Sequence, residues 1–177
     1  MEADTDFIEK YLEIYSETQG VLPGRLEEFG KKYREQGHLT RDQLYEIAYE
    51  SSTRSAHHVR DNPEERCIEV TENAREVDGD FSKIALIGSL KGFKAPTASC
   101  VLAALDPGRH AVVDTRVWAS LERLGFFDTR KESFDADDYV EMIKPIRTLA
   151  EQTGFTPVEV GYALFAHDYD VREGTLH

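Results

Sequence analysis

The sequence predicts an all-α protein, a compact helical bundle of about eight or nine helices. Apolar and aromatic residues recur every three or four positions along most of the chain, the spacing that places them on one face of a helix. Residues that cap helices, such as Thr40, Asp114 and Asp135, stand at the start of several of these segments. Alternation of apolar and polar residues does not persist beyond the short stretch 110–113, so no strand is expected.

The first half of the chain predicts four helices. The apolar faces of the first two are Phe7, Tyr11, Ile14 and Tyr15, and Leu26, Phe29 and Tyr33. The break between them is expected at Pro23-Gly24. Thr40 and Gln43 form a capping box at the head of LTRDQLYEIAYESS, and Asn62-Pro63 is expected to cap EERCIEVTENAREV.

A helix, a tight glycine turn and a second helix follow, as a helix-hairpin-helix motif predicted at 82–105. Asp80 or Ser82 is expected to cap FSKIALIGSL, and Pro96 or Thr97 to open TASCVLAAL. The turn chemistry of the next three residues, DPG, ends the second helix.

The last third predicts three more helices. Asp114 stands at the start of DTRVWASLERLG, and Asp135 and Thr156 are expected to cap the final two. A bend or break is expected at Pro145, within the first of these two helices.

A chain of 177 residues fits a single domain, 1–177, and is long enough to bury a stable core. The best candidate for a boundary between two parts of the chain is the stretch VDGD at 77–80. Two interlocked helical lobes, about 1–78 and 79–177, are therefore the alternative organisation.

The net charge is −13, from 34 acidic and 21 basic residues. This charge opposes nonspecific attraction to nucleic acid or anionic lipid. Two interpretations stay open: the protein avoids nucleic acid, or it works in a high-salt cytoplasm where ions screen its charges.

Cys67 and Cys100 are the only cysteines, and their spacing encodes neither an iron–sulfur cluster nor a cysteine zinc site. No cofactor and no metal are expected. The amino terminus lacks the pattern of a signal peptide, and no apolar run approaches the length of a membrane span. A cytoplasmic protein without a membrane partner is the simplest expectation.

The glycine turn has the features of an anion site. A tight turn before a helix presents backbone N–H groups at the positive end of the helix dipole, so a phosphate can be held there without a dense basic patch. Lys91 and Lys94 flank Gly92 in this turn. Packing between helices is the alternative role of such a turn.

Residues 90–118 resemble the helix-hairpin-helix superfamily of DNA glycosylases, whose pattern is roughly L-P-G-V-G-x-K-T-A, an apolar helix, and V-D-T-H-V. The matching residues, at the family's spacing, are Leu90, Gly92, Thr97, Ala98, Val113, Asp114, Thr115 and Val117. The resemblance implies an all-helical fold, duplex DNA with a damaged or modified base as partner, and phosphate contacts from Lys91, Gly92, Lys94 and Thr97.

The chain departs from the family pattern at three points. Lys94 replaces the second hairpin glycine, and Pro96 stands where bifunctional members carry a nucleophilic lysine. Proline cannot form a Schiff base, so the resemblance implies a monofunctional enzyme. The iron–sulfur cysteines of the family are also missing.

The resemblance implies that Asp114 is the catalytic carboxylate of an N-glycosyl hydrolase. A carboxylate beside the sugar stabilises the positive charge that develops as the bond to the base breaks. A helix cap without a catalytic role is the alternative for Asp114. For the whole chain, the alternatives are a non-catalytic DNA- or protein-binding module of the same fold, and an unrelated acidic helical protein.

Trp118 and Tyr49 are the candidates for a base pocket, because a base extruded from a duplex needs aromatic or apolar walls. Core packing is the alternative for Trp118. The histidines of STRSAHHVR, His57 and His58, are read as a phosphate contact or a solvated loop. The late aromatic residues Phe155, Tyr162, Phe165 and Tyr169 are predicted to lie in the core.

Overall fold

The computed structural model describes residues 2–19 and 21–174, and in these residues the protein is helical with no strand. The all-α prediction is confirmed. Nine α-helices and one 3₁₀ helix are described: α1 (Thr5–Gln19), α2 (Val21–Gln36), α3 (Arg41–Ser51), η1 (Ala56–Asp61), α4 (Glu64–Glu76), α5 (Asp80–Gly88), α6 (Ala95–Leu105), α7 (Thr115–Arg123), α8 (Ala136–Thr153) and α9 (Pro157–Gly174).

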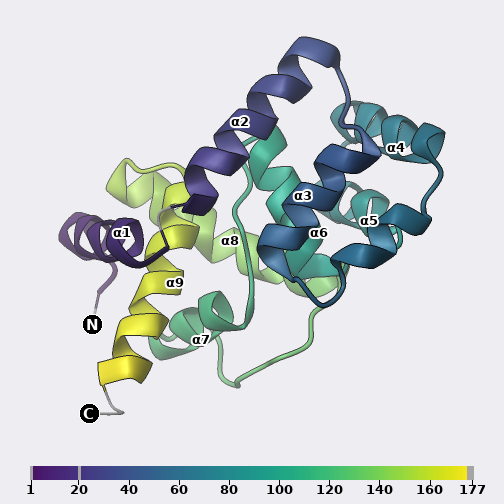
Figure 1. Ribbon diagram of the computed structural model, residues 1–177. Helices are drawn as coiled ribbons and strands as arrows, with labels where there is room; N and C mark the ends of the chain where they lie inside the picture. Colours follow the sequence, from purple (N-terminus) through teal and green to yellow (C-terminus); the bar gives the residue numbers. More distant parts are fainter. Residues whose placement is uncertain (1, 20, 175–177) are drawn as a thin grey trace.

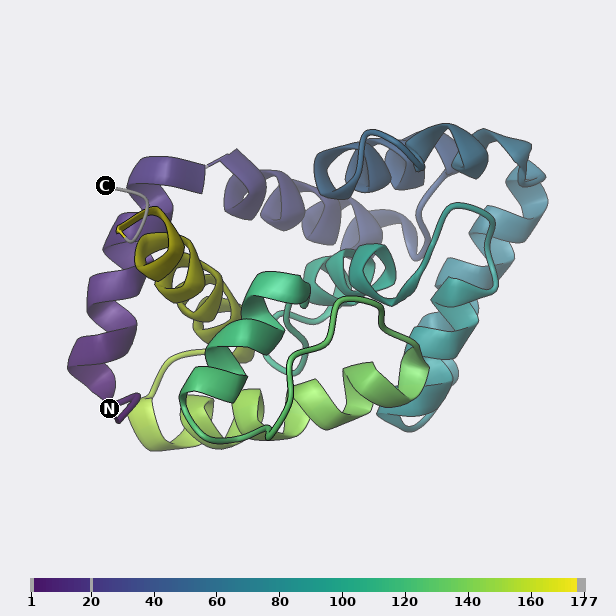
Figure 2. The ribbon, with the colours of Figure 1, turned by 90° about the horizontal axis from the view of Figure 1, so that it is seen from below.

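Helix α6 occupies the middle of the molecule (Figure 1). It packs against α2, α3, α5 and α8. Nearly every residue of its sequence APTASCVLAAL is buried, as expected for a helix that is apolar on all sides. Helices α1 and α9 lie side by side at one end of the molecule and α4 and α5 lie at the other, as Figures 1 and 2 agree.

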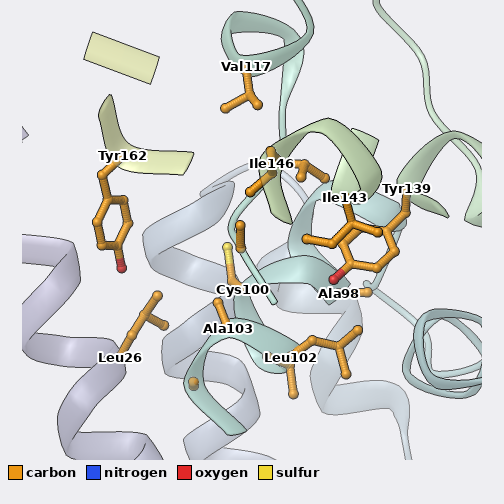
Figure 3. Packing of buried hydrophobic residues seen from close by; sticks show 14 of the residues in the cluster. Leu26, Ala98, Cys100, Leu102, Ala103, Val117, Tyr139, Ile143, Ile146 and Tyr162 are labelled. Carbon is orange, nitrogen blue, oxygen red and sulfur yellow. The ribbon is translucent and has the colours of Figure 1, made fainter. Parts of the chain in front are cut away.

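The hydrophobic core is one continuous cluster that draws residues from both sides of the predicted boundary near residue 78. In Figure 3, Leu26 of α2 and Tyr162 of α9 lie on one side of Cys100, and Tyr139 and Ile143 of α8 lie on the other. The buried face of α6 therefore joins the two ends of the bundle.

Four predicted caps are confirmed. Thr40 forms a reciprocal capping box with Gln43 at the start of α3, and Asp135 does the same with Asp138 at the start of α8. Thr156 accepts a hydrogen bond from the N–H of Glu159 at 3.3 Å at the start of α9, and its own N–H donates to the Glu159 carboxylate at 3.1 Å. Asp114 caps α7 by accepting a hydrogen bond from the N–H of Val117.

Other predicted helix boundaries are wrong. Helix α2 begins at Val21, so Pro23 lies in its first turn, where its missing N–H costs nothing. Helix α6 begins at Ala95, one residue before the predicted Pro96. Helix α8 continues through Pro145, so the break that was one of the two expectations there is absent, and the bend stays a prediction.

Asp80 does not cap α5, because Gly79 is the N-cap residue and the Asp80 carboxylate is engaged elsewhere. Its two oxygens accept hydrogen bonds from the Arg147 guanidinium of α8 at 2.5 and 2.8 Å. This pairing holds the pKa of Asp80 below its usual value. The carboxylate thus joins α5 to α8, a role that sequence spacing does not indicate.

Among the described helices, none is long and apolar enough to cross a membrane.

Candidate functional site

The predicted hairpin is present between α5 and α6, and Gly92 is the residue that allows its turn. Its φ of +90° is strained for residues with a side chain. A Cβ at this position would also lie 2.8 Å from Cγ2 of Val59 and 3.0 Å from the Val59 backbone nitrogen. Glycine is therefore needed for both the backbone conformation and the close approach of η1.

Asn62 fastens the hairpin to the rest of the molecule. Its Nδ2 donates to the carbonyl oxygens of Val59 and Lys91, both at 2.9 Å, and its Oδ1 accepts from the N–H of Lys91 at 2.9 Å. The predicted capping role is wrong, since Pro63 is the N-cap of α4 and makes no side-chain cap. Asn62 is only 1% exposed, so these bonds are shielded from water.

We expect Asn62→Ala to lower the free energy of unfolding by about 2 kcal/mol, because it removes the three hydrogen bonds that a buried side chain makes to the backbone of Val59 and Lys91. The corresponding fall in melting temperature is roughly 5 °C for a chain of this size. Asn73→Ala is the matched control, an exposed asparagine of α4. Equal melting temperatures for the two variants would contradict the role given to Asn62.

Part of the hairpin stays available to a ligand. Within the described part of the chain, the N–H groups of Gly92, Lys94, Ala95 and Thr97 make no hydrogen bond, whereas that of Lys91 is used by Asn62. Neither lysine forms an ion pair with a described carboxylate. The turn therefore retains backbone donors at the start of α6, as an anion site requires.

Asp114 ends a short extended segment that crosses α6. The N–H of Val113 donates to Oγ of Ser99 at 3.0 Å, which fixes this segment to the helix. Oδ1 of Asp114 then accepts from the N–H of Val117 at 2.9 Å. The Asp114 carboxylate is thus held at the start of the helix that it caps.

Burial raises the pKa of Asp114 to about 6. The N–H groups of Val117 and Arg116 and the charge of Arg116 favour the ionised form, and the charge of Asp168 opposes it. The carboxylate is therefore mostly ionised at neutral pH and becomes protonated in mild acid.

One cleft of about 920 Å³ brings Asp114 and the hairpin together. Its volume lies within the range of about 300–1,000 Å³ typical of small-molecule sites. Residues from the hairpin and the start of α6 line it: Gly92, Phe93, Lys94, Pro96, Thr97 and Cys100. The carboxylates of Glu50 and Glu132 line it as well.

One wall of the cleft is aromatic. Tyr15 of α1 stacks on Tyr162 of α9 with ring centroids 4.6 Å apart, and Phe165 meets the Tyr15 ring edge-on at 5.7 Å. Burial raises the pKa of Tyr15, and the nearby groups of Cys100 and Asp114 raise it further. These phenols therefore stay protonated at neutral pH, next to the carboxylate.

Trp118 and Tyr49 do not line this cleft. Trp118 is buried: its Nε1 donates to the carbonyl of Thr129 at 2.8 Å, and its ring stacks on Phe127 at 4.1 Å. It supports the connection between α7 and α8, which delivers Ser133 and Phe134 to the cleft. Tyr49 is 51% exposed on the surface of α3.

Some residues of the cleft were not among the predicted site residues. Ser51 and Ser52 line it, and Oγ of Ser51 lies 3.1 Å from the hydroxyl of Thr97. Of the two histidines considered as phosphate contacts, His58 lines the cleft and His57 does not. Tyr162 and Phe165 were predicted as core from their helical spacing, but each also presents surface to the cleft. Spacing along one helix cannot distinguish these two environments, because both lie on the inward face.

Helix α7, which carries Asp114 at its start, is held against α9 by a buried ion cluster. Asp168 of α9 is fully buried and accepts from Arg116 at 3.3 Å, from Arg172 at 2.8 Å, and from Arg123. The cluster joins both turns of α7 to α9 and so fixes where the Asp114 carboxylate lies relative to the aromatic wall.

Among residues 2–19 and 21–174, no group of three or more histidine, cysteine, aspartate or glutamate side chains is placed to hold a metal ion. Comparisons of the chain with models of protein families, with curated proteins and with solved structures give no match.

Proposed function

We propose that the protein is a monofunctional DNA glycosylase, an enzyme that hydrolyses the N-glycosidic bond of a damaged or modified base. The observation that supports this most directly is that one cleft joins the Asp114 carboxylate, the glycine hairpin and a wall of aromatic rings. The resemblance of residues 90–118 to helix-hairpin-helix glycosylases gives each of these parts a role.

In this proposal the extruded base enters the cleft and packs against the aromatic wall of Tyr15, Tyr162 and Phe165. The bond between the sugar and the base breaks with both electrons leaving on the base. Asp114 stabilises the positive charge that develops on the sugar and accepts a proton from the water that adds to the sugar carbon. The departing base takes up a proton, and the product is an abasic site.

The hairpin is proposed to hold a phosphate of the same strand. Its unpaired N–H groups and the Lys94 side chain supply the donors for this phosphate. Positive charge is added by Lys91 of the same turn, by Arg60 of η1, which packs on Gly92, and by Arg54 just before η1. In the described ranges, none of the three forms an ion pair with a carboxylate. Such a local patch permits DNA binding by a chain of strongly negative net charge.

The test is base release from duplexes that carry deaminated, oxidised, alkylated or glucosylated bases, at low and at high salt. Hot alkali then reveals abasic sites as strand breaks. We expect breaks only after alkali. Breaks without alkali would contradict the monofunctional mechanism and direct attention to Lys94, whose amine lies at the cleft.

DNA binding without base release, on every duplex tested, would instead favour the non-catalytic binding module. If the protein neither bound DNA nor released a base, an unrelated function would be favoured.

Base release is expected to depend on pH through Asp114. Because burial raises the pKa of this carboxyl to about 6, the catalytic ionised form is lost as the pH falls through that value. The single-turnover rate should drop by about tenfold per pH unit in the acid limb. A flat profile between pH 5 and pH 8, with the fold intact, would contradict a role for the ionised carboxylate.

A further inference from the structure

A second, smaller cavity lies around the far end of α6 from the hairpin. It has a volume of about 220 Å³ and is formed where α2, α4, α5 and α6 meet. Its lining is unusual for this chain, because it includes three cationic residues, Arg34, Arg75 and Lys83, of which Arg34 also lines a neighbouring cavity. Only one carboxylate, Asp106, accompanies them.

These cations come from three different helices and stay without carboxylate partners. In the described ranges, none of the three forms an ion pair, although the chain contains 34 acidic residues. Nζ of Lys83 donates to the carbonyl of Ala74 at 2.6 Å, and the Arg75 guanidinium lies 5.1 Å from the centre of the Tyr33 ring. Both contacts fix the position of a cation without neutralising its charge.

The other polar side chains of the lining, Tyr33 and His110, do not change this balance. The Tyr33 hydroxyl donates to the carbonyl of Thr71 at 3.1 Å. His110 is buried, and its Nδ1 lies 2.5 Å from the hydroxyl of Tyr139. Burial and the nearby charge of Arg147 lower its pKa to about 4, so the imidazole is neutral at physiological pH. The cavity therefore carries three positive charges and one negative charge.

We propose that this cavity binds a tetrahedral oxyanion, as inorganic phosphate or as the phosphate of a phosphomonoester. Arginine and lysine donate charge-assisted hydrogen bonds to such oxygens, and here three of them, from three separate helices, line one cavity. The volume equals that of about seven water molecules, which admits a phosphate but leaves a nucleoside outside. This inference is independent of the proposed glycosylase activity.

The experiment measures the melting temperature of the protein in phosphate and in chloride at matched ionic strength, and the affinity for phosphate by calorimetry. Bound phosphate should raise the melting temperature beyond the effect of salt alone. Arg34→Gln should weaken phosphate binding by about tenfold or more, because it removes one charged donor. Arg66→Gln, which removes the same charge from an exposed position on α4 outside the cavity, should not weaken it.

Stability without phosphate separates binding from a structural role. Mutual repulsion among three cations predicts that Arg34→Gln alone melts at the same temperature as the unaltered protein, or higher. A loss of stability without phosphate, together with an unchanged response to phosphate, would overturn the proposal. So would equal melting temperatures in phosphate and chloride for the unaltered protein.

Further arms identify the source of the anion. A deoxynucleoside monophosphate that binds more tightly than phosphate, with the same dependence on Arg34, would assign the cavity to a phosphomonoester. Competition by an undamaged duplex would assign it to a nucleic-acid backbone phosphate and exclude both small-molecule sources.

Discussion

Asp114→Asn should lower the rate of base release by about 10²–10⁴-fold, the range for loss of a positioned acid–base group. The amide keeps the shape of the carboxylate and the oxygen that caps α7 by accepting from Val117. It cannot accept a proton from water or stabilise a cationic sugar to the same degree. The measurement is single-turnover base release on whichever duplex the panel identifies.

The same substitution should stabilise the fold at pH 8. The pKa of Asp114 is raised in the folded state, so the folded protein binds more protons than the unfolded chain at pH values between about 4 and 6. Stability from this group therefore falls as the pH rises through that window. Removing the charge should add about 1–2 kcal/mol at pH 8 and almost nothing at pH 4.

Asp135→Asn is the matched control, because Asp135 also caps a helix but does not line the cleft. It should leave base release unchanged. If Asp114→Asn released base at the rate of Asp135→Asn, Asp114 would be a cap without a catalytic role. If Asp114→Asn lost activity because it unfolded, its melting temperature would be lower than that of the unaltered protein. The stabilisation expected at pH 8 predicts the opposite change.

Asp168→Asn should lower the free energy of unfolding by about 3–5 kcal/mol, the usual cost of removing one partner from a buried ion pair. The carboxylate is fully buried, and Arg116, Arg123 and Arg172 all point their charges at it. Without it, these three cations face one another at the contact between α7 and α9. For a chain of this length we expect the melting temperature to fall by about 10 °C.

Asp170→Asn provides the control for this experiment, since Asp170 is an exposed residue of the same helix. Its melting temperature should stay close to that of the unaltered protein. A change of less than 1 °C for Asp168→Asn, measured at the same salt concentration, would mean that the cost of burying this carboxylate offsets its pairing. A folded Asp168→Asn variant should also lose part of its base release, because α7 positions Asp114.

Much of the fold could be predicted because its signals are local. A capping box such as that of Thr40 and Gln43 depends on residues three positions apart, and the helical spacing of α1 depends on one turn and the next. Asp114 was recognised as a cap for the same reason. Asp114 and the hairpin are separated in the sequence by the single helix α6, and both line the same cleft.

Other features were missed because the partners are far apart in the sequence. Asp80 looked like a cap, but Arg147, 67 positions later, is the partner of its carboxylate. Asn62 also looked like a cap, but its side chain reaches Lys91, 29 positions away. A short polar side chain before a helix has several potential partners, and only the packing of helices decides which of them is near.

The sequence by itself determined the helices, most of their caps and the pairing of a glycine turn with a lone carboxylate, since each of these rests on backbone preferences within a few residues. The tertiary structure alone decided that Tyr15 and Tyr162 line one cleft with Asp114, that Trp118 is buried outside the lining of that cleft, and that Arg34, Arg75 and Lys83 line a second cavity. These arrangements depend on which helix faces pack together. Burial of apolar surface selects that packing, and because this driving force is non-directional, the sequence pattern of one helix does not identify the helix that it packs against.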